Sequence, residues 1–196
     1  MHTQIQMILT PEQAYKQEML LEEVSKKINI PTEDITSVRT IRKSIDARSF
    51  QPKINITVEV YWKEQPPVHV AEKFIYQNVS GKKPVIVVGA GPAGLFAALK
   101  LIQNGFKPIV LERGKEHEAR RSDIANLNRN KGIDPESNFC FGAGGAGTYS
   151  DGKLYSRSKK KGSPQEIYEI LHQHGASEEI LFDAHPHIGS DKLPHV

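Results

Sequence analysis

The sequence lacks most of the features that mark secreted, membrane-spanning or disulfide-bonded proteins. Of its 196 residues only Cys140 is a cysteine, which excludes an internal disulfide and fits a reducing compartment. Its apolar runs are all far shorter than the roughly 20 residues that cross a bilayer. The first residues alternate polar and apolar positions and form no apolar core of a signal peptide. We therefore expect a cytoplasmic protein with no membrane partner.

An excess of charge of one sign is also absent. The 26 lysines and arginines nearly balance 23 aspartates and glutamates, which gives a formal net charge of +3. Aromatic residues make up only 7% of the chain. A nucleic-acid-binding protein usually has a clear basic excess, so the composition carries no strong nucleic-acid signal. It is typical of a globular protein with a lean core.

Residues 1–63 predict a small domain with the element order β-α-β-β. The apolar residues alternate at positions 5–9 and 54–60, as on half-buried strands. Thr10 marks the start of a helix, because a proline follows it directly and a glutamine stands three residues after it. Residues 35–46 fit neither period cleanly and favour a further strand.

A boundary between two domains is predicted near residue 80, where a turn rich in glycine, lysine and proline breaks the pattern. We assign residues 1–80 to a small N-terminal α/β domain with its linker, a ferredoxin-like half. Residues 81–196 are assigned to the first part of a Rossmann-type FAD/NAD(P)-binding domain. After the boundary only two strands of a parallel sheet are found, at 85–89 and 108–112. This α/β domain is therefore expected to be incomplete.

The most informative segment joins those two strands. Four apolar residues at 85–88 run into Gly89, Gly91 and Gly94, which have the spacing Gly-x-Gly-x-x-Gly. In a dinucleotide site the first glycine makes the tight turn, the second lets a pyrophosphate approach the backbone, and the third packs helix on strand. The anion then lies at the N-terminus of a helix, here expected at about 92–103. The segment predicts a parallel strand-helix-strand unit that binds a dinucleotide.

The acid at the end of the second strand bears on which dinucleotide is bound. Glu112 lies 18 residues after Gly94, where a Rossmann unit places a carboxylate for the ribose hydroxyls. A carboxylate repels a 2′-phosphate, which favours FAD or NAD over NADP. The neighbouring Arg113 points the other way, because an arginine can accept that phosphate. The residues alone place FAD only slightly ahead of NAD.

A second glycine-rich segment follows at residues 142–152. Five of its eleven residues are glycine, which costs a regular element too much conformational entropy. Such a segment suits a backbone that lies against a flat or anionic ligand. The aromatic residues Phe139, Phe141 and Tyr149 indicate partial burial. We expect this loop to face a ligand, and the alternative is a flexible surface loop.

Other residue groups suggest chemistry that their arrangement does not support. The five histidines from residue 172 onwards lie on opposite sides of a helix or across a proline, so no metal site is predicted. Disulfide reductases use paired cysteines, and the single Cys140 is instead expected to be a small buried residue. Ser150 has no Gly-x-Ser-x-Gly around it, which excludes a hydrolytic triad. The cations at 157–161 are expected on a solvated face.

The motifs resemble those of one family. The segments GAGPAGLFAA, LERG, PESNFCFGAGGAGTYSDGKL and DAHPHIGSDKL are similar to those of uncharacterised bacterial FAD-dependent dehydrogenases. These proteins are also called NAD(FAD)-utilizing dehydrogenases and belong to the glutathione-reductase-like FAD superfamily. The resemblance covers about residues 36–196 and includes the run RKSIDAR at 42–48. It implies a small α/β domain ahead of the flavin domain.

The resemblance also implies which residues hold FAD. The first glycine turn and the strand-end acid would bind the adenosine half, and the second glycine segment would approach the flavin. The implied cofactor-binding residues are Gly89, Ala90, Gly91, Pro92, Ala93, Gly94, Glu112, Arg113, Gly144, Gly145, Ala146, Gly147, Thr148, Ser150 and Asp151. NAD(P)H is the implied electron donor of the full-length protein. No catalytic residue is identified.

The length of the chain departs from that family. Its members are much longer, and in this superfamily a late Gly-Asp motif supplies the acid that binds the ribityl chain. This sequence contains no Gly-Asp dipeptide. We therefore expect an N-terminal fragment that requires the missing C-terminal half of its own domain and retains flavin poorly alone.

Two functions remain open at this point. The first is an FAD-binding oxidoreductase, in which the flavin carries hydride to or from an unidentified small-molecule substrate. The second is a non-catalytic nucleotide- or RNA-binding module, with NAD at the glycine turn. In that case Arg39, Arg42, Lys43 and Arg48 would contact the partner. A yellow purified protein would favour the first function.

Overall fold

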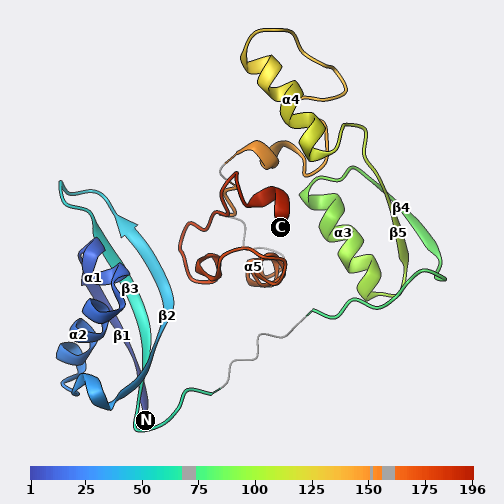
Figure 1. Cartoon of the computed structure of the whole chain (residues 1–196). Coiled ribbons are helices and arrows are strands. Elements are labelled where there is room, and N and C mark those ends of the chain that lie inside the picture. The colour runs from blue at the N-terminus through green and yellow to red at the C-terminus, as the bar shows by residue number, and fades with distance from the viewer. Residues whose placement is uncertain (68–73, 151, 156–161) are drawn as a thin grey trace. The chain divides into compact units, whose positions relative to one another are not determined.

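The structure is a computed structural model that describes residues 1–67, 74–150, 152–155 and 162–196 (Figure 1). The chain forms two compact units. Both contain helices and strands, which confirms the predicted α/β fold class. The units comprise Met1–Ala71, Tyr155–Tyr168 and Glu178–Pro186 in the first, and Glu72–Leu154, Glu169–Ser177 and His187–Val196 in the second. The division of the chain at residue 80 stays a prediction.

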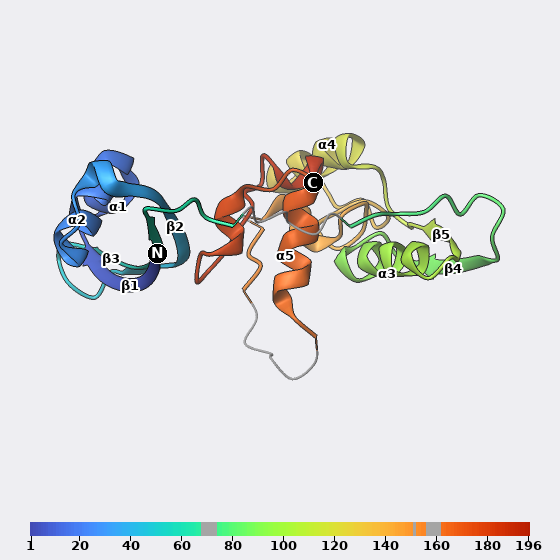
Figure 2. The same ribbon diagram turned by 90° about the horizontal axis from the view of Figure 1, so that it is seen from below.

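The first unit contains a three-stranded antiparallel sheet with two helices on one of its faces (Figures 1 and 2). The strand order is β1-β3-β2, with β1 and β2 both antiparallel to β3. The predicted order β-α-β-β is confirmed. Its elements are β1 (His2–Leu9), α1 (Pro11–Tyr15), α2 (Gln17–Ile28), the short 3-10 turn η1 (Thr32–Asp34), β2 (Ile35–Asp46) and β3 (Lys53–Trp62).

The helical segment begins as its sequence predicts but is not continuous. The Thr10 hydroxyl accepts from the backbone N–H of Gln13 (3.3 Å), and the Gln13 side chain accepts from the backbone N–H of Thr10 (2.9 Å). This reciprocal cap satisfies two N–H groups that a helix start leaves without partners. The extended backbone of Lys16 (φ −91°, ψ 115°) then separates α1 from α2.

The core of the first unit lies between the sheet and the two helices. β3 alternates strictly over most of its length, and its inward side chains are almost fully buried. The buried side chains are Met7, Leu9, Ala14, Val24, Ile54, Ile56, Val58 and Val60. They come from β1, α1, α2 and β3, and the partly buried Ile35 and Val38 of β2 pack against them, so one aliphatic cluster joins all the main elements of this unit.

The second unit is built on a parallel strand-helix-strand unit, as predicted. β4 (Pro84–Val88) and β5 (Lys107–Leu111) pair in parallel, and α3 (Pro92–Gln103) connects them (Figure 1). α4 (His117–Asn128) follows, and a 3-10 turn, η2 (Ala146–Tyr149), lies within the second glycine segment. The remaining elements of the chain are α5 (Pro164–Gln173), η3 (Glu178–Leu181) and η4 (Leu193–His195).

One face of the two-stranded sheet is uncovered. Ile86 pairs with Ile109 and Val88 with Leu111, so these four side chains share a face. All four are exposed, Val88 to 83%. We call them the aliphatic face of the β4-β5 pair. Among the described residues no helix is both long and apolar enough to span a bilayer.

Two paired isoleucines that differ in exposure provide a test of the core of the first unit. Ile54 of β3 is 1% exposed, whereas its cross-strand partner Ile45 of β2 is 65% exposed. We expect Ile54→Ala to lower the free energy of unfolding of the first unit by about 2–5 kcal/mol. Ile45→Ala should change it by no more than about 0.5 kcal/mol.

The chain has one tryptophan, Trp62 at the end of β3, so its fluorescence during urea unfolding reports on this unit. Equal shifts of the unfolding midpoint in the two variants would contradict the core described above.

Candidate dinucleotide-binding site

The first glycine turn closes the end of β4 onto the end of β5. Gly89 has φ +95°, a conformation that residues with a side chain rarely adopt. Its backbone N–H donates to the carbonyl oxygen of Leu111 (2.7 Å). The turn is therefore held against the second strand at the point where the strand-end acid emerges.

The third glycine packs the helix against this turn. A Cβ built on Gly94 would lie 1.9 Å from the carbonyl oxygen of Gly89 and 3.4 Å from Val87. No side chain fits there, so Gly94 lets α3 approach the turn and the strand, as its spacing predicts.

Gly91 occupies a different environment at the start of α3. It is the N-cap residue, and a Cβ built on it would find only the Cα of Gly145, at an ordinary contact distance of 3.7 Å. The backbone N–H groups of Gly91, Ala93 and Gly94 make no hydrogen bond within the described part of the chain. This turn therefore presents N–H donors and the positive end of a twelve-residue helix.

The Glu112 carboxylate connects three backbone segments. One oxygen, Oε2, accepts from the backbone N–H of Ala90 (2.7 Å). The other, Oε1, accepts from the backbone N–H groups of Gly114 (2.9 Å) and Gly142 (3.1 Å). These donors, with Gly114 and Ala90 contributing most, lower the pKa of Glu112 below its ordinary value.

The second glycine segment lies directly against the first. The backbone N–H of Gly144 donates to the carbonyl oxygen of Ala90 (2.8 Å). A Cβ built on Gly145 would lie 3.1 Å from the Cα of Gly91 and 3.3 Å from Pro92 Cδ. Glycine at 145, whose φ is +72°, thus allows the two backbones to meet.

The remaining predicted loop residues mostly bond within the loop. Thr148 is buried, and its hydroxyl donates to the carbonyl oxygens of Gly145 (3.1 Å) and Ala143 (3.3 Å). The Ser150 hydroxyl donates to the carbonyl oxygen of Gly147 (2.8 Å). The loop contains the 3-10 turn η2, although its glycine content predicts no regular element. Asp151 and the cations at 157–161 lie outside the described residues.

Arg113 is engaged by a neighbouring acid. Its Nε and Nη2 donate to the two oxygens of Glu136, at 2.5 and 2.7 Å. The guanidinium also lies 4.5 Å from the centre of the Phe141 ring. A 2′-phosphate at this arginine would have to displace a bidentate carboxylate, which is the strongest geometry for such a pair.

The sequence analysis missed Arg120, although it is fully buried. Arg120 lies on α4 one turn before Ile124, the other buried residue of this helix. Its guanidinium donates to three backbone carbonyls in the segment that leads into the second glycine loop. The helical spacing 120, 124, 127 was the available signal, but an arginine is rarely assigned to a core.

The prediction for Cys140 is wrong. Cys140 is exposed, and the flanking Phe139 and Phe141 are 37% and 36% exposed. The turn is set instead by Asn138, whose side-chain oxygen accepts from the backbone N–H of Cys140 (2.8 Å). An Asn side chain that bonds two residues ahead stabilises such a turn and leaves the cysteine on its outside.

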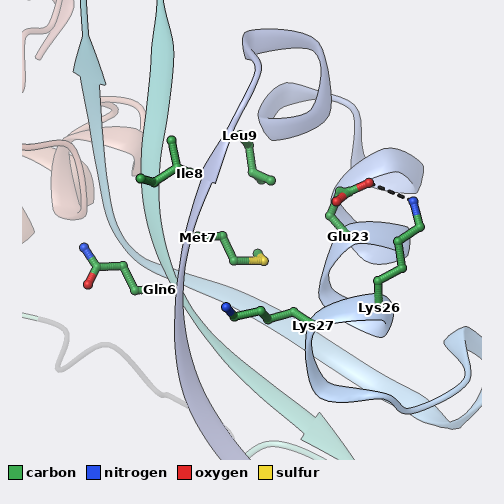
Figure 3. A pocket seen from close by; sticks show the side chains of 7 residues that line it. All are labelled: Gln6, Met7, Ile8, Leu9, Glu23, Lys26 and Lys27. Carbon is green, nitrogen blue, oxygen red and sulfur yellow. Dashed lines mark hydrogen bonds and ion pairs between the residues drawn. The ribbon is translucent and has the colours of Figure 1, made fainter.

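The first unit contains a hollow of its own. It is a groove of about 610 Å³ between β1 and α2, lined by Gln6, Met7, Ile8, Leu9, Glu23, Lys26 and Lys27 (Figure 3). Glu23 and Lys26 pair across 2.8 Å, and the other lining residues offer no acid-base or nucleophilic set. The glycine segments are therefore the better candidate site, on the basis of their donors and close backbone approach.

Two of the four cations that could serve a nucleic-acid partner are engaged within the first unit. Lys43 is buried, with Nζ 3.3 Å from Glu179 and 3.4 Å from Asp183. Arg48 donates twice to Asp46. These contacts remove two of the four cations on which an RNA-binding function would depend.

Comparison with known families decides what kind of α/β unit this is. The model described as FAD binding domain matches residues 84–183, just over half of the chain. The chain belongs to this FAD binding domain family. The match begins at the first residue of β4 and includes both glycine segments and Glu112. Residues 1–61 match a second model, described as a domain of unknown function (DUF8436).

Two relatives are longer than this chain. An uncharacterized protein of Clostridium beijerinckii is 35% identical over 193 residues, which cover 91% of this chain and 36% of that protein. A dual trans-enoyl reductase/FAD-dependent monooxygenase of Aspergillus terreus, tazHJ, is 37% identical over 54 residues, 28% of this chain and 8% of that protein. The chain thus spans about a third of the length of the Clostridium protein.

The role of Glu112 in joining the segments can be tested by removing its charge. Glu112→Gln replaces one acceptor oxygen by an amide that donates, so a backbone N–H loses its partner. We expect the opening free energy at Ala90, measured by amide hydrogen exchange, to fall by about 1–3 kcal/mol. Glu118→Gln, at an exposed acid of the first turn of α4, is the matched control and should leave it unchanged.

The same pair of proteins has an expected pH dependence. Because the folded-state pKa of Glu112 is lower than its ordinary value of 4.5, its stabilisation is complete above that value. It is lost as the pH falls through the lowered pKa, so the difference between wild type and Glu112→Gln should shrink there. A difference that stays constant with pH would contradict the ionised bridge.

Proposed function

We propose that this chain holds the adenosine diphosphate half of FAD in a flavin-dependent oxidoreductase of the dehydrogenase type. The observation that carries this proposal is the contact of the two glycine segments at the start of α3, joined through Glu112. The FAD binding domain match covers the same residues. When bound, the flavin would supply the hydride chemistry, with NAD(P)H as the donor in the longer protein.

The residues present fit a diphosphate. The unbonded N–H groups of Gly91, Ala93 and Gly94 would donate to phosphate oxygens at the positive end of α3. Gly91 has no side chain, and the approach from its side is limited by Gly145 alone. Ala146 and Gly147, on the facing segment, would complete the lining.

The acid fits a ribose less fully than the sequence predicts. Its two oxygens already accept the backbone N–H groups of Ala90, Gly114 and Gly142, so Glu112 would have little capacity left to accept a pair of ribose hydroxyls. Arg113 would stay with Glu136. These two features support FAD over a cofactor with a 2′-phosphate.

The aliphatic face of the β4-β5 pair supports the proposal that additional polypeptide covers this sheet. A parallel sheet is normally covered on both faces, but here Ile86, Val88, Ile109 and Leu111 are exposed. We assign this face to the remaining part of a longer polypeptide, of the kind seen in the Clostridium beijerinckii relative. The flavin ring would then be enclosed by residues beyond those of this chain.

Substitution at the second glycine separates binding from folding. Because a Cβ on Gly91 meets only an ordinary contact, Gly91→Val should leave the thermal unfolding temperature nearly unchanged. The added side chain would take the place of the diphosphate, so affinity for FAD, titrated by flavin fluorescence, should fall at least about tenfold. Gly81→Val, at a glycine with open space around it, is the control. Unchanged affinity in Gly91→Val would overturn the assignment of this turn to FAD.

A separate experiment tests whether flavin binding depends on additional polypeptide. We expect this chain to hold well under one flavin per polypeptide after purification and to self-associate through its exposed aliphatic face. The Clostridium beijerinckii protein, prepared in parallel, should hold close to one. Flavin absorbance and sedimentation measure both properties. A monomeric chain with one FAD bound would show that residues 1–196 suffice.

A further inference from the structure

Arg120 is a buried charge that no described acid neutralises. Its side chain is fully buried, and within the described part of the chain no carboxylate lies at ion-pair distance from it. Burial of an unpaired cation costs several kcal/mol, so such a group is retained only where something offsets that cost. The neighbouring Arg121 is exposed and shows what an ordinary arginine does on this helix.

Backbone carbonyls and one ring surround the guanidinium. Nε donates to the carbonyl oxygen of Asn138 (2.9 Å), Nη2 to that of Phe139 (3.0 Å) and Nη1 to that of Ala143 (2.9 Å). The Tyr149 ring lies 5.1 Å from the guanidinium carbon. One planar side chain thus holds the turn at Asn138 and Phe139 and the start of the second glycine segment at Ala143. Only arginine has a rigid fork of donors able to do this.

The peptide between Ala143 and Gly144 links Arg120 to the first glycine turn. Its carbonyl accepts from Arg120, and its N–H donates to the carbonyl oxygen of Ala90 (2.8 Å). In a trans peptide these two groups point in opposite directions, so one rigid plane bridges the arginine and the turn. The position of the second glycine segment over the start of α3 therefore depends on Arg120.

Gly142 shows how closely the loop encloses the arginine. A Cβ built on Gly142 would lie 2.4 Å from Arg120 Cδ and 2.8 Å from its Nε. The glycine at 142 is thus required by the arginine, whereas those at 144 and 145 face other groups. The glycine-rich segment therefore has two functions at different residues. Gly142 encloses the arginine, and Gly145 contacts the first glycine turn.

We infer that Arg120 is a positioning residue for the cofactor, and that its positive charge would be offset by a diphosphate bound between the two glycine segments. This inference rests on the proposed function. In the low-dielectric interior the attraction between a buried cation and a nearby dianion is much stronger than in water. Because this attraction acts through space, no direct contact between Arg120 and phosphate is required.

Two variants separate the charge from the geometry. Arg120→Lys keeps the positive charge but loses the planar fork, whereas Arg120→Met loses both. Arg121→Met is the matched control. We expect both Arg120 variants, without nucleotide, to exchange the backbone amides of residues 139–148 faster than wild type, and the control to match wild type. Unchanged exchange in both variants would overturn the positioning role.

Binding of ADP and of adenosine tests the charge. Arg120→Met should lose at least about tenfold more affinity for ADP than for adenosine, and Arg120→Lys should keep most of that selectivity. Equal losses for the two ligands would overturn the electrostatic role, because loss of a charge that attracts the diphosphate must weaken ADP more than adenosine. If Arg120→Met does not fold, an Arg120→Lys variant whose ADP selectivity is lost would overturn it as well.

Failure of the proposed function would look different. If wild-type protein bound neither ADP nor FAD, the proposed function would fail. The exchange experiment needs no ligand and would still decide whether Arg120 orders the second glycine segment.

Discussion

The second unit depends on one carboxylate that accepts three backbone N–H groups. Glu112 ends β5 and binds the first glycine turn, its own following turn and the second glycine segment. These three pieces of chain contain few side chains that could pack together, because glycine provides none. Hydrogen bonds to an ionised acceptor, roughly twice as strong as neutral ones, replace the apolar contacts that usually hold a loop.

Arg120 extends this arrangement with the opposite charge. Glu112 accepts from the N–H of Gly142, and Arg120 donates to the carbonyl of Ala143, so adjacent residues are held by an anion and by a cation. The loop thus acquires a fixed shape from electrostatics instead of from burial. A flexible loop would have to be ordered when the cofactor binds, at a cost in affinity, and a preformed one avoids this cost.

The sequence predicted those features that follow from local rules. Alternation defined the strands of the first unit, Thr10 defined the helix start, and the glycine spacing defined the β4-α3-β5 unit, because each signal lies within a few residues. Features that depend on contacts distant in sequence were missed. The burial of Arg120, the pairing of Arg113 with Glu136 and the exposure of Cys140 all arise from the path of the loop between α4 and η2. No periodicity encodes that path.

The strand register of the first unit has a consequence for how it folds. β2 and β3 are joined by a short connection and pair from Asp46 opposite Lys53 outwards, so their hairpin closes a small loop. β1 pairs with the far strand in sequence, His2 opposite Tyr61, and must wait until the chain up to the end of β3 is available. Because closing a longer loop costs more chain entropy, we expect the β2-β3 hairpin to form early and β1 to join late. The slow step in folding this unit would then be the arrival of its own first strand.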